Sequence, residues 1–430
     1  MDNLSKRDSK IIWHPYTQHK LNPDSIGVVK AKGAYVYDES GKRYIDALGS
    51  WWTCIHGHTH PYIAKKVSSQ LKKLEHVIFA GFTHAPAVEL AERLLKKLPK
   101  NQKKIFFSDN GSTAIEVGLK MCFQYWYNNG IPKEKVIAFR NDYHGDTFGA
   151  MSVSERGAFT QPFQSHLFET IFIDAPVRGK EKGSIEQLKS SVARHPLSIS
   201  AFIFEPLVQG VAGMVMHDPE TLNEMIRICR ENKIFTIADE VFTGFGRTGK
   251  FFATDYISQK PDIFCLSKGL TGGTMAMGIT SCTKEIFNTF LSEDRMKTFF
   301  HGHSFTANPV ACSAALASMD LMDKKETWQN IKRIEKSHKQ FVKHISRQSS
   351  VVSRILDIRI LGTILAIELK SQNETSYFNP IRDRAASFFL AKGILLRPLG
   401  NVIYLVPPYC ISDKDLQYIY NSIEEFLQLI

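Results

Sequence analysis

Short apolar runs alternate with amphipathic segments through the middle of this 430-residue chain, and this alternation restricts its fold more than any other feature. Several runs are apolar at successive positions, which is typical of strands in a parallel sheet with helices on both faces. The alternation therefore predicts the α/β class, with a large, doubly wound and mostly parallel sheet. The strand candidates are Ile105–Ser108, Val136–Arg140, Ala201–Glu205, Ile234–Asp239 and Ile263–Ser267.

Two helices are predicted between or before these strands. The segment Ala85–Leu98 carries its apolar side chains on one stripe, as an amphipathic helix does. A second helix is expected to start at Ser112-Thr113 and to run through Trp126. Glu116 follows Thr113 by three residues, which indicates a capping box at the start of this helix.

The pattern changes after about residue 320. A charged helical stretch is followed by strand candidates and by a last helix that Ser412 caps. Two of these strands flank Gly400-Asn401, which favours a tight hairpin turn. Mixed strands and helices predict a second, smaller α+β domain, and the chain is long enough for two domains. The segments are Asp320–Ile345 for the helix and Leu356–Leu369, Ile394–Pro398 and Asn401–Val406 for the strands.

Composition excludes several classes of protein. The 54 Lys and Arg residues exceed the 43 Asp and Glu residues, for a net charge of +11, but they are spread over many segments and indicate solvated helix faces. A nucleic-acid-binding protein is therefore only a rival hypothesis. The first twenty residues have no apolar core of a secretory signal, and no segment is apolar enough to span a membrane. Seven cysteines without a C-x-x-C pair indicate reduced, buried thiols, so we expect a cytoplasmic protein.

Two motifs resemble binding sites but lack the required context. The segment Gly244–Gly249 fits the G-x-G-x-x-G pattern of dinucleotide binding, yet the preceding strand ends at Asp239 and no helix clearly follows. A nicotinamide-dependent oxidoreductase built on this loop stays a rival. The second motif mimics a metal site, but no other cluster of ligands accompanies it, so we expect no metal. It consists of Cys54, His56, His58 and His60.

A more specific constellation combines Asp239, Lys268 and the segment Gly111–Thr113. Asp239 and Lys268 each follow an apolar strand, so both are expected at the edge where open α/β sheets bind ligands. Gly111–Thr113 opens a helix after a third strand, where free N–H groups favour an anion such as phosphate. An amine, a carboxylate and a phosphate seat together suit pyridoxal 5'-phosphate (PLP).

These residues belong to motifs that together resemble the class III PLP-dependent aminotransferases over nearly the whole chain. The resemblance implies fold type I of the PLP-dependent transferases and a homodimer with shared active sites. It also implies a large PLP-binding domain at residues 51–320 and a small domain formed by residues 1–50 together with 321–430. The motifs are Asp46–Gly49, His58–Pro61, Phe107–Ser112, Tyr143–Gly145, Glu205-Pro206, Asp239–Val241, Gly244–Gly249, Pro261-Asp262, Ser267–Gly269 and His303–Pro309.

The resemblance assigns roles around the cofactor. Lys268 would bind PLP covalently and then move the proton between substrate and cofactor, and Asp239 would keep the ring nitrogen protonated. Phosphate would be held by Gly111 and Ser112. The other implied cofactor residues are Tyr143 against the ring, Glu205 in the same pocket and Ser304 from a neighbouring subunit.

The resemblance also implies a site for an aliphatic substrate. The segments Trp13–Gln18, Ser50–Trp52 and Arg397-Pro398 with Tyr404–Tyr409 are similar to one branch of the family. In that branch, Arg397 would pair with a distant carboxylate and Tyr16 would count among the catalytic residues. The implied substrate residues are Tyr16, Trp51, Trp52, Tyr143, Gly302, Arg397 and Tyr404. The identity of the amino donor stays open, and so does an ω-aminotransferase acting on ornithine or 4-aminobutyrate.

Overall fold

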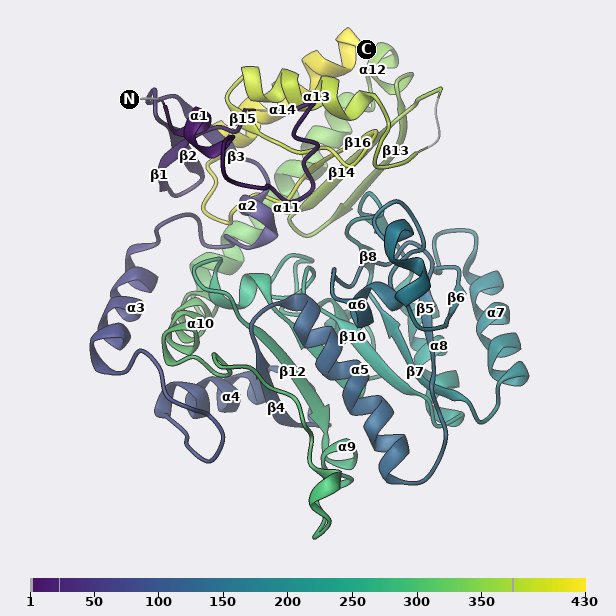
Figure 1. Cartoon of the computed structure of the whole chain (residues 1–430). Coiled ribbons are helices and arrows are strands. Elements are labelled where there is room, and N and C mark those ends of the chain that lie inside the picture. The colour runs from purple at the N-terminus through teal and green to yellow at the C-terminus, as the bar shows by residue number, and fades with distance from the viewer. Residues whose placement is uncertain (1–2, 23, 373–374) are drawn as a thin grey trace.

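The computed structural model describes residues 3–22, 24–372 and 375–430 and has a seven-stranded sheet at its centre (Figure 1). The strands are Gln102–Ser108 (β4), Lys135–Phe139 (β5), Thr170–Ile173 (β6), Ile199–Phe204 (β7), Phe235–Asp239 (β10), Ile263–Leu266 (β11) and Gly278–Thr283 (β12). Their order is β4-β12-β11-β10-β7-β5-β6. β12 is antiparallel to its two neighbours, and β11, β10, β7, β5 and β6 are parallel. The sheet confirms the predicted α/β class.

Both faces of the sheet are covered, which explains the continuous apolar runs. In β5, Ile137 and Phe139 pack into one hydrophobic core, whereas Val136 and Ala138 pack into a second core on the opposite face. All four side chains are fully buried. Successive strand residues point to opposite faces, so a strand between two cores must be apolar at every position.

Strand β12 was not predicted from the sequence, because its buried face includes polar side chains. The Thr280 hydroxyl donates to the carbonyl of Ala114 at 2.7 Å, and the Ser281 hydroxyl donates to Oε1 of Gln102 at 2.6 Å. Both residues are fully buried. Only the neighbouring elements supply these acceptors, so no local pattern marked the segment as a strand.

Helices pack on both sides of the sheet (Figure 1). One of them, α5, contacts β11 and β12, while α8 packs on β10 and α7 on β6. The helix predicted at residues 85–98 is confirmed as α4, but the stretch predicted at 320–345 belongs to two helices, α10 and α11. The bounds are Pro61–Lys73 (α3), Ala85–Lys97 (α4), Gly111–Asn128 (α5), Phe148–Ser152 (α6), Glu181–Arg194 (α7), Pro219–Glu231 (α8), Pro309–Met322 (α10) and Lys325–Ile345 (α11).

The capping box expected at Thr113 and Glu116 was wrong. Helix α5 begins one turn earlier, where the Asn110 side chain accepts from the Thr113 N–H at 2.9 Å and the Thr113 hydroxyl accepts from the Asn110 N–H at 3.1 Å. Glu116 instead accepts from the N–H of Gly149 at 2.7 Å. This carboxylate therefore anchors the start of α6, a contact that the local sequence does not specify.

A second group of sheets lies above the central one in Figure 1. One sheet has the order β1-β2-β3-β15 and another the order β13-β14-β16. Because β15 pairs with β3, the two ends of the chain meet in one sheet. This pairing supports the predicted division into two domains, which stays a prediction. The strands are Val28–Lys32 (β1), Tyr35–Asp38 (β2), Arg43–Asp46 (β3), Ile355–Leu361 (β13), Ile364–Leu369 (β14), Ile394–Leu395 (β15) and Val402–Leu405 (β16).

The tight turn predicted at Gly400-Asn401 is confirmed, because Leu399 and Val402 exchange both backbone hydrogen bonds across it at 3.0 Å, but the flanking strands do not pair with each other. β15 pairs with β3 and β16 pairs with β14, so the two strands belong to different sheets. Gly400 has a φ of 60° and makes a turn, but only Leu399 and Val402 form a bridge across it. The last helix, Asp413–Leu429 (α14), is confirmed, with the Ser412 hydroxyl accepting from the Asp415 N–H.

Two further expectations concern the cysteines and membrane spans. Six of the seven cysteines are buried, and Cys410 is exposed. Within the described ranges, no helix combines the length and the apolar character needed to cross a bilayer.

Candidate active site

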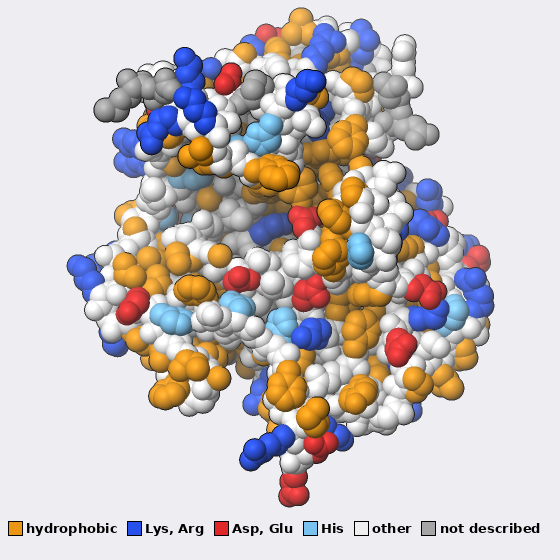
Figure 2. Space-filling view, in the orientation of Figure 1, with side chains coloured by type: hydrophobic (Ala, Val, Ile, Leu, Met, Phe, Trp, Pro, Cys, Tyr) orange, Lys and Arg blue, Asp and Glu red, His pale blue; other side chains and the backbone are white. Residues whose placement is uncertain are grey.

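A cavity of about 760 Å³, here called the central cavity, lies beyond the carboxyl ends of the parallel strands. Figure 2 shows the molecule hollowed between its upper and lower parts in this view. The structure brings together eleven of the residues implied by the sequence, from segments far apart in the chain. These lining residues are Tyr16, Trp51, Trp52, Gly111, Ser112, Tyr143, Glu205, Asp239, Lys268, Arg397 and Tyr404.

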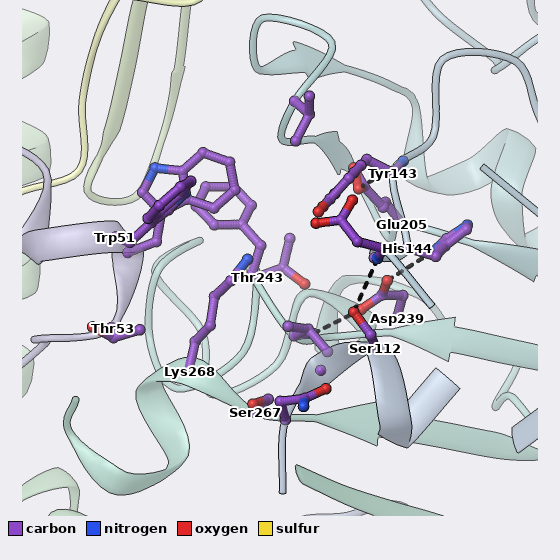
Figure 3. A pocket seen from close by; sticks show the side chains of 18 of the residues that line it. Trp51, Thr53, Ser112, Tyr143, His144, Glu205, Asp239, Thr243, Ser267 and Lys268 are labelled. Carbon is purple, nitrogen blue, oxygen red and sulfur yellow. Dashed lines mark hydrogen bonds and ion pairs between the residues drawn. The ribbon is translucent and has the colours of Figure 1, made fainter. Parts of the chain in front are cut away.

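Lys268 projects into the central cavity from the end of β11 (Figure 3). Its Nζ lies 4.4 Å from the centre of the Trp52 ring and 5.8 Å from that of Phe242. Burial lowers the pKa of Lys268 to about 8, although the carboxylates of Asp239 and Glu205 act in the opposite direction. A lysine with a pKa near neutrality supplies a neutral amine, which is the nucleophilic form.

Asp239 lies at the end of β10 and is held by a buried histidine. Its Oδ2 accepts from Nδ1 of His144 at 2.7 Å, and Nε2 of His144 lies 3.5 Å from Oδ2 of Asp142. Burial by itself lowers the pKa of His144, but the nearby carboxylates of Asp142 and Asp239 outweigh it and raise this pKa to about 10. The imidazolium is therefore a cation between two buried carboxylates.

Glu205 forms a further buried carboxylate beside this chain. Its Oε1 accepts from the Tyr143 N–H at 3.3 Å and its Oε2 from the Gly210 N–H at 2.6 Å. Burial, followed by the negative charge of Asp142, raises the pKa of Glu205 well above its ordinary range. Burial therefore favours the protonated form of Glu205.

The start of α5 forms an anion seat on the floor of the cavity. The Ser112 hydroxyl accepts from the Asp146 N–H at 3.2 Å, and the loop that carries Gly145 closes over it. Gly145 has a φ of 128°, and a Cβ there would lie 1.9 Å from the Ser112 hydroxyl oxygen. Only glycine allows this approach, which leaves the first N–H groups of the helix facing a compact space.

Aromatic side chains and Arg397 form the opposite wall. The rings of Tyr16 and Trp51 are 5.5 Å apart, and the guanidinium carbon of Arg397 lies 5.3 Å from the Trp51 ring centre. Tyr16 bonds through its hydroxyl to Tyr143 at 3.0 Å and also to Asp146. Arg397 makes no ion pair within the described ranges, so its planar donors are available to a carboxylate.

Gly302 and Ser304 are not brought into the central cavity of this chain. Both lie in an exposed loop before α10. The resemblance places Ser304 in the site of a neighbouring subunit, and the positions in one chain agree with a role outside its own cavity. Their participation stays a prediction.

The sequence-based reasoning missed several residues of the site. Asp142 and Asp146 flank the Tyr143–Gly145 motif, and their proximity in the sequence could have indicated them. Tyr377 also lines the cavity. No motif in the sequence marks it, because it lies in an irregular segment far from the other motifs. Its hydroxyl accepts from Arg397 at 2.9 Å.

The motifs that lacked a functional context have structural partners. The Gly244–Gly249 loop is followed by a short 3₁₀ turn instead of the helix that dinucleotide binding requires. Within this loop, the buried Arg247 donates to the carbonyls of Trp52 and Pro407. His56 bonds to Ser318 and His58 to Asp46. Among the described residues, no group of His, Cys, Asp and Glu side chains is arranged to hold a metal ion.

The residues present fit PLP. An amine after one strand, a carboxylate backed by a cation after the next strand, and an anion seat at a helix N-terminus together define a PLP-dependent enzyme of fold type I. The chain matches the family model of the class-III aminotransferases over residues 16–427 and belongs to that family. Class III aminotransferases use PLP, so the cofactor and the family inferred from the sequence are both confirmed.

More specific similarities extend over the full chain. An adenosylmethionine-8-amino-7-oxononanoate aminotransferase from Synechococcus elongatus is 43% identical over 427 residues, which cover 97% of this chain and 99% of the relative. The enzyme of the same name from Helicobacter pylori is 33% identical, with 99% and 98% coverage. The crystal structure of the Methanocaldococcus jannaschii enzyme of this name has a TM-score of 0.93 at 34% identity, covering 99% of this chain and 98% of that one.

Proposed function

We propose that this enzyme transfers an amino group to 8-amino-7-oxononanoate and forms 7,8-diaminononanoate, a step of biotin biosynthesis, with S-adenosylmethionine as the donor. The observation that carries the proposal is the shape of the central cavity. Lys268 lies against the Trp52 ring, and the guanidinium of Arg397, which makes no ion pair among the described residues, lies against the Trp51 ring, so that aromatic rings accompany both groups. An aliphatic substrate with an amino ketone at one end and a carboxylate at the other fits this arrangement. The names of the full-length relatives support the same substrates.

The cofactor would be held by residues that line the central cavity. Gly111 and Ser112 would bind its phosphate, Tyr143 would cover one face of its ring, and Glu205 would lie close by. When bound, PLP supplies a ring that accepts the electron pair released at the substrate carbon. Asp239 would hold a proton at the ring nitrogen, and its hydrogen bond with His144 would fix the direction of this carboxylate.

Lys268 acts as the acid–base group of the reaction. Lys268 would hold the cofactor covalently, and its neutral Nζ would take up and release the proton that leaves the substrate carbon. A pKa of about 8 allows the amine to accept and to release a proton near neutral pH. The enclosing rings of Trp52 and Phe242 exclude water from this amine, since both lie within 6 Å of it.

The aromatic wall and Arg397 orient the substrate. Trp51, Trp52 and Tyr404 would pack along its aliphatic chain, and Arg397 would pair with its carboxylate through two parallel hydrogen bonds. Tyr16, bonded to Tyr143 and Asp146, would position the reacting amine.

A homodimer with shared active sites is part of the proposal. Exposed apolar side chains cluster on two adjoining segments, since the His76 and Phe305 rings are 5.4 Å apart. Such a cluster is typical of a protein interface. It would place Gly302 and Ser304 at the partner's cavity. The exposed side chains are Ile78, Phe82, Met296, Phe300 and Phe305. We propose a cytoplasmic location, since six of the seven thiols are buried and free.

The deciding experiment is an assay of the PLP-loaded protein with 8-amino-7-oxononanoate, comparing S-adenosylmethionine with lysine as donor. Formation of 7,8-diaminononanoate by the wild type and none by Lys268→Ala supports the proposal. Turnover of ornithine or 4-aminobutyrate with 2-oxoglutarate, and none with the oxononanoate, would favour the alternative ω-aminotransferase. Turnover with lysine alone would change the donor and leave the acceptor unchanged.

A further inference from the structure

The turn that carries Trp51 and Trp52 has an unfavourable backbone. In this segment, Gly49–Trp52 (α2), Gly49 has a φ of 60°, Ser50 a φ of 61° with a ψ of −109°, and Trp52 a φ of 67°. Ser50 and Trp52 carry side chains and rarely adopt a positive φ. Surrounding contacts must therefore hold the turn in place.

Asp46 makes two of the contacts that hold this turn, beside the hydrogen bond from Arg247 to the Trp52 carbonyl. Its Oδ1 accepts from the Leu48 N–H at 3.0 Å, and its Oδ2 accepts from the Ser50 N–H at 2.6 Å. The carboxylate is fully buried. A buried carboxylate that accepts backbone N–H groups fixes their direction, and here it fixes the direction of the chain immediately before the two tryptophans.

His58 is the ion-pair partner of Asp46 within the described ranges. Its Nε2 lies 2.8 Å from Oδ2 of Asp46. The His58 backbone is itself fixed, because its N–H donates to the carbonyl of Gly33 and its carbonyl accepts from the Gly33 N–H. The hydrogen bond to Asp46 raises the pKa of His58 to about 10, so the ring is a cation at neutral pH and balances the buried carboxylate.

The same turn determines two walls of the central cavity. Trp52 places its ring 4.4 Å from Nζ of Lys268, and Trp51 places its ring 5.3 Å from the guanidinium of Arg397. Asp46 also pairs with Leu395 in the register of β3 and β15, two residues before Arg397. The position of Asp46 is thus connected to both ends of the site.

We propose that Asp46 and His58 are positioning residues that hold Trp51, Trp52 and Arg397 in the geometry required by a carboxylate-bearing acceptor. Neither side chain lines the cavity. Both act through the turn and through β15. The choice of acceptor in the test rests on the proposed function, whereas the positioning itself rests on the contacts described above.

The test compares Asp46→Asn, His58→Phe and His58→Gln with the wild type, all as PLP-loaded proteins. His338→Gln is the matched control, because His338 is a fully buried histidine with two hydrogen bonds and does not line the cavity. We expect Asp46→Asn and His58→Phe to raise the KM for 8-amino-7-oxononanoate about tenfold and to lower kcat/KM about 100-fold. His58→Gln keeps an N–H donor for Asp46 and should recover most of the loss.

A second readout is the near-ultraviolet circular dichroism of the tryptophans, which should change in Asp46→Asn and His58→Phe and stay the same in His338→Gln. If the wild-type protein does not turn over the oxononanoate, the proposed function is contradicted, but the positioning role is not. The circular dichroism of the variants then decides whether Asp46 and His58 position the tryptophans. Variants that match His338→Gln in kinetics and dichroism would overturn the positioning role. Should Asp46→Asn fail to fold, the two His58 variants give the same decision.

Discussion

Replacing His144 by Asn removes a cation from between two buried aspartates and leaves an N–H donor for Asp239. The pKa of His144 lies at about 10 in the fold, against an ordinary value of 6.5. Each pH unit corresponds to about 1.4 kcal/mol, so the charged form contributes about 5 kcal/mol at low pH and about 4 kcal/mol at pH 7. This agrees with the roughly 3–5 kcal/mol lost when one partner of a buried ion pair is removed.

The sign of the pH dependence follows from the raised pKa. The stabilisation is complete below pH 6.5, where the unfolded chain also carries the proton, and it disappears as the pH rises through about 10. Wild-type protein should therefore unfold roughly 4–5 °C above His144→Asn at pH 7, and this difference in unfolding temperature should narrow toward pH 10.

The assay is thermal unfolding of wild type, His144→Asn and His338→Asn with saturating PLP, in steps from pH 7 to pH 10. His338 is the control because burial lowers its pKa to about 4 and keeps it neutral throughout this range. The difference in unfolding temperature between wild type and His338→Asn should therefore not change with pH. A pH-independent gap for His144→Asn, or no gap at pH 7, would refute the charge assigned to His144.

Three further predictions concern the site. Protein freed of PLP should bind the cofactor again at a rate that rises with pH around a midpoint of about 8, because only neutral Lys268 attacks the aldehyde. Stopped-flow absorbance measures this rate, and a midpoint near 10.5, the ordinary pKa of lysine, would contradict the prediction. Arg397→Lys keeps the charge but loses the two-pronged contact, so the KM for 8-amino-7-oxononanoate should rise about tenfold or more in steady-state assays, and an unchanged KM would remove Arg397 from the site. Mixing Lys268→Ala subunits with Ser304→Trp subunits should restore about half the activity per hybrid dimer, since one site is then intact, whereas self-contained sites would give no recovery.

The agreement between sequence and structure is best where the information is local. The strand before Asp239 is apolar on both faces, and the strand before Lys268 is as well, so the sequence placed both residues at the same sheet edge. Helix α14 carries its own cap and apolar stripe, and it was predicted correctly. These features depend on residue order alone, because period and capping act over a few residues.

Other features depend on partners that are distant in the chain. β12 is a strand because α5 and β4 supply acceptors for its hydroxyls. The tight turn at Gly400 forms as predicted, but beyond Leu399 and Val402 the two strands pair with β3 and β14 and not with each other. Local turn chemistry determined the turn, and tertiary contacts determined the partners of the strands.

The sequence by itself determined the α/β class, the family and the cofactor, and it predicted the amine and carboxylate that would serve the cofactor, because hydrophobic patterns and short motifs lie in the order of residues. Only the tertiary structure decided the environment of those groups. It placed the imidazolium of His144 between Asp142 and Asp239, and it placed Asp46 behind the two tryptophans. Burial and charge at a side chain depend on all the segments that surround it, and the order of residues along the chain does not specify which segments those are.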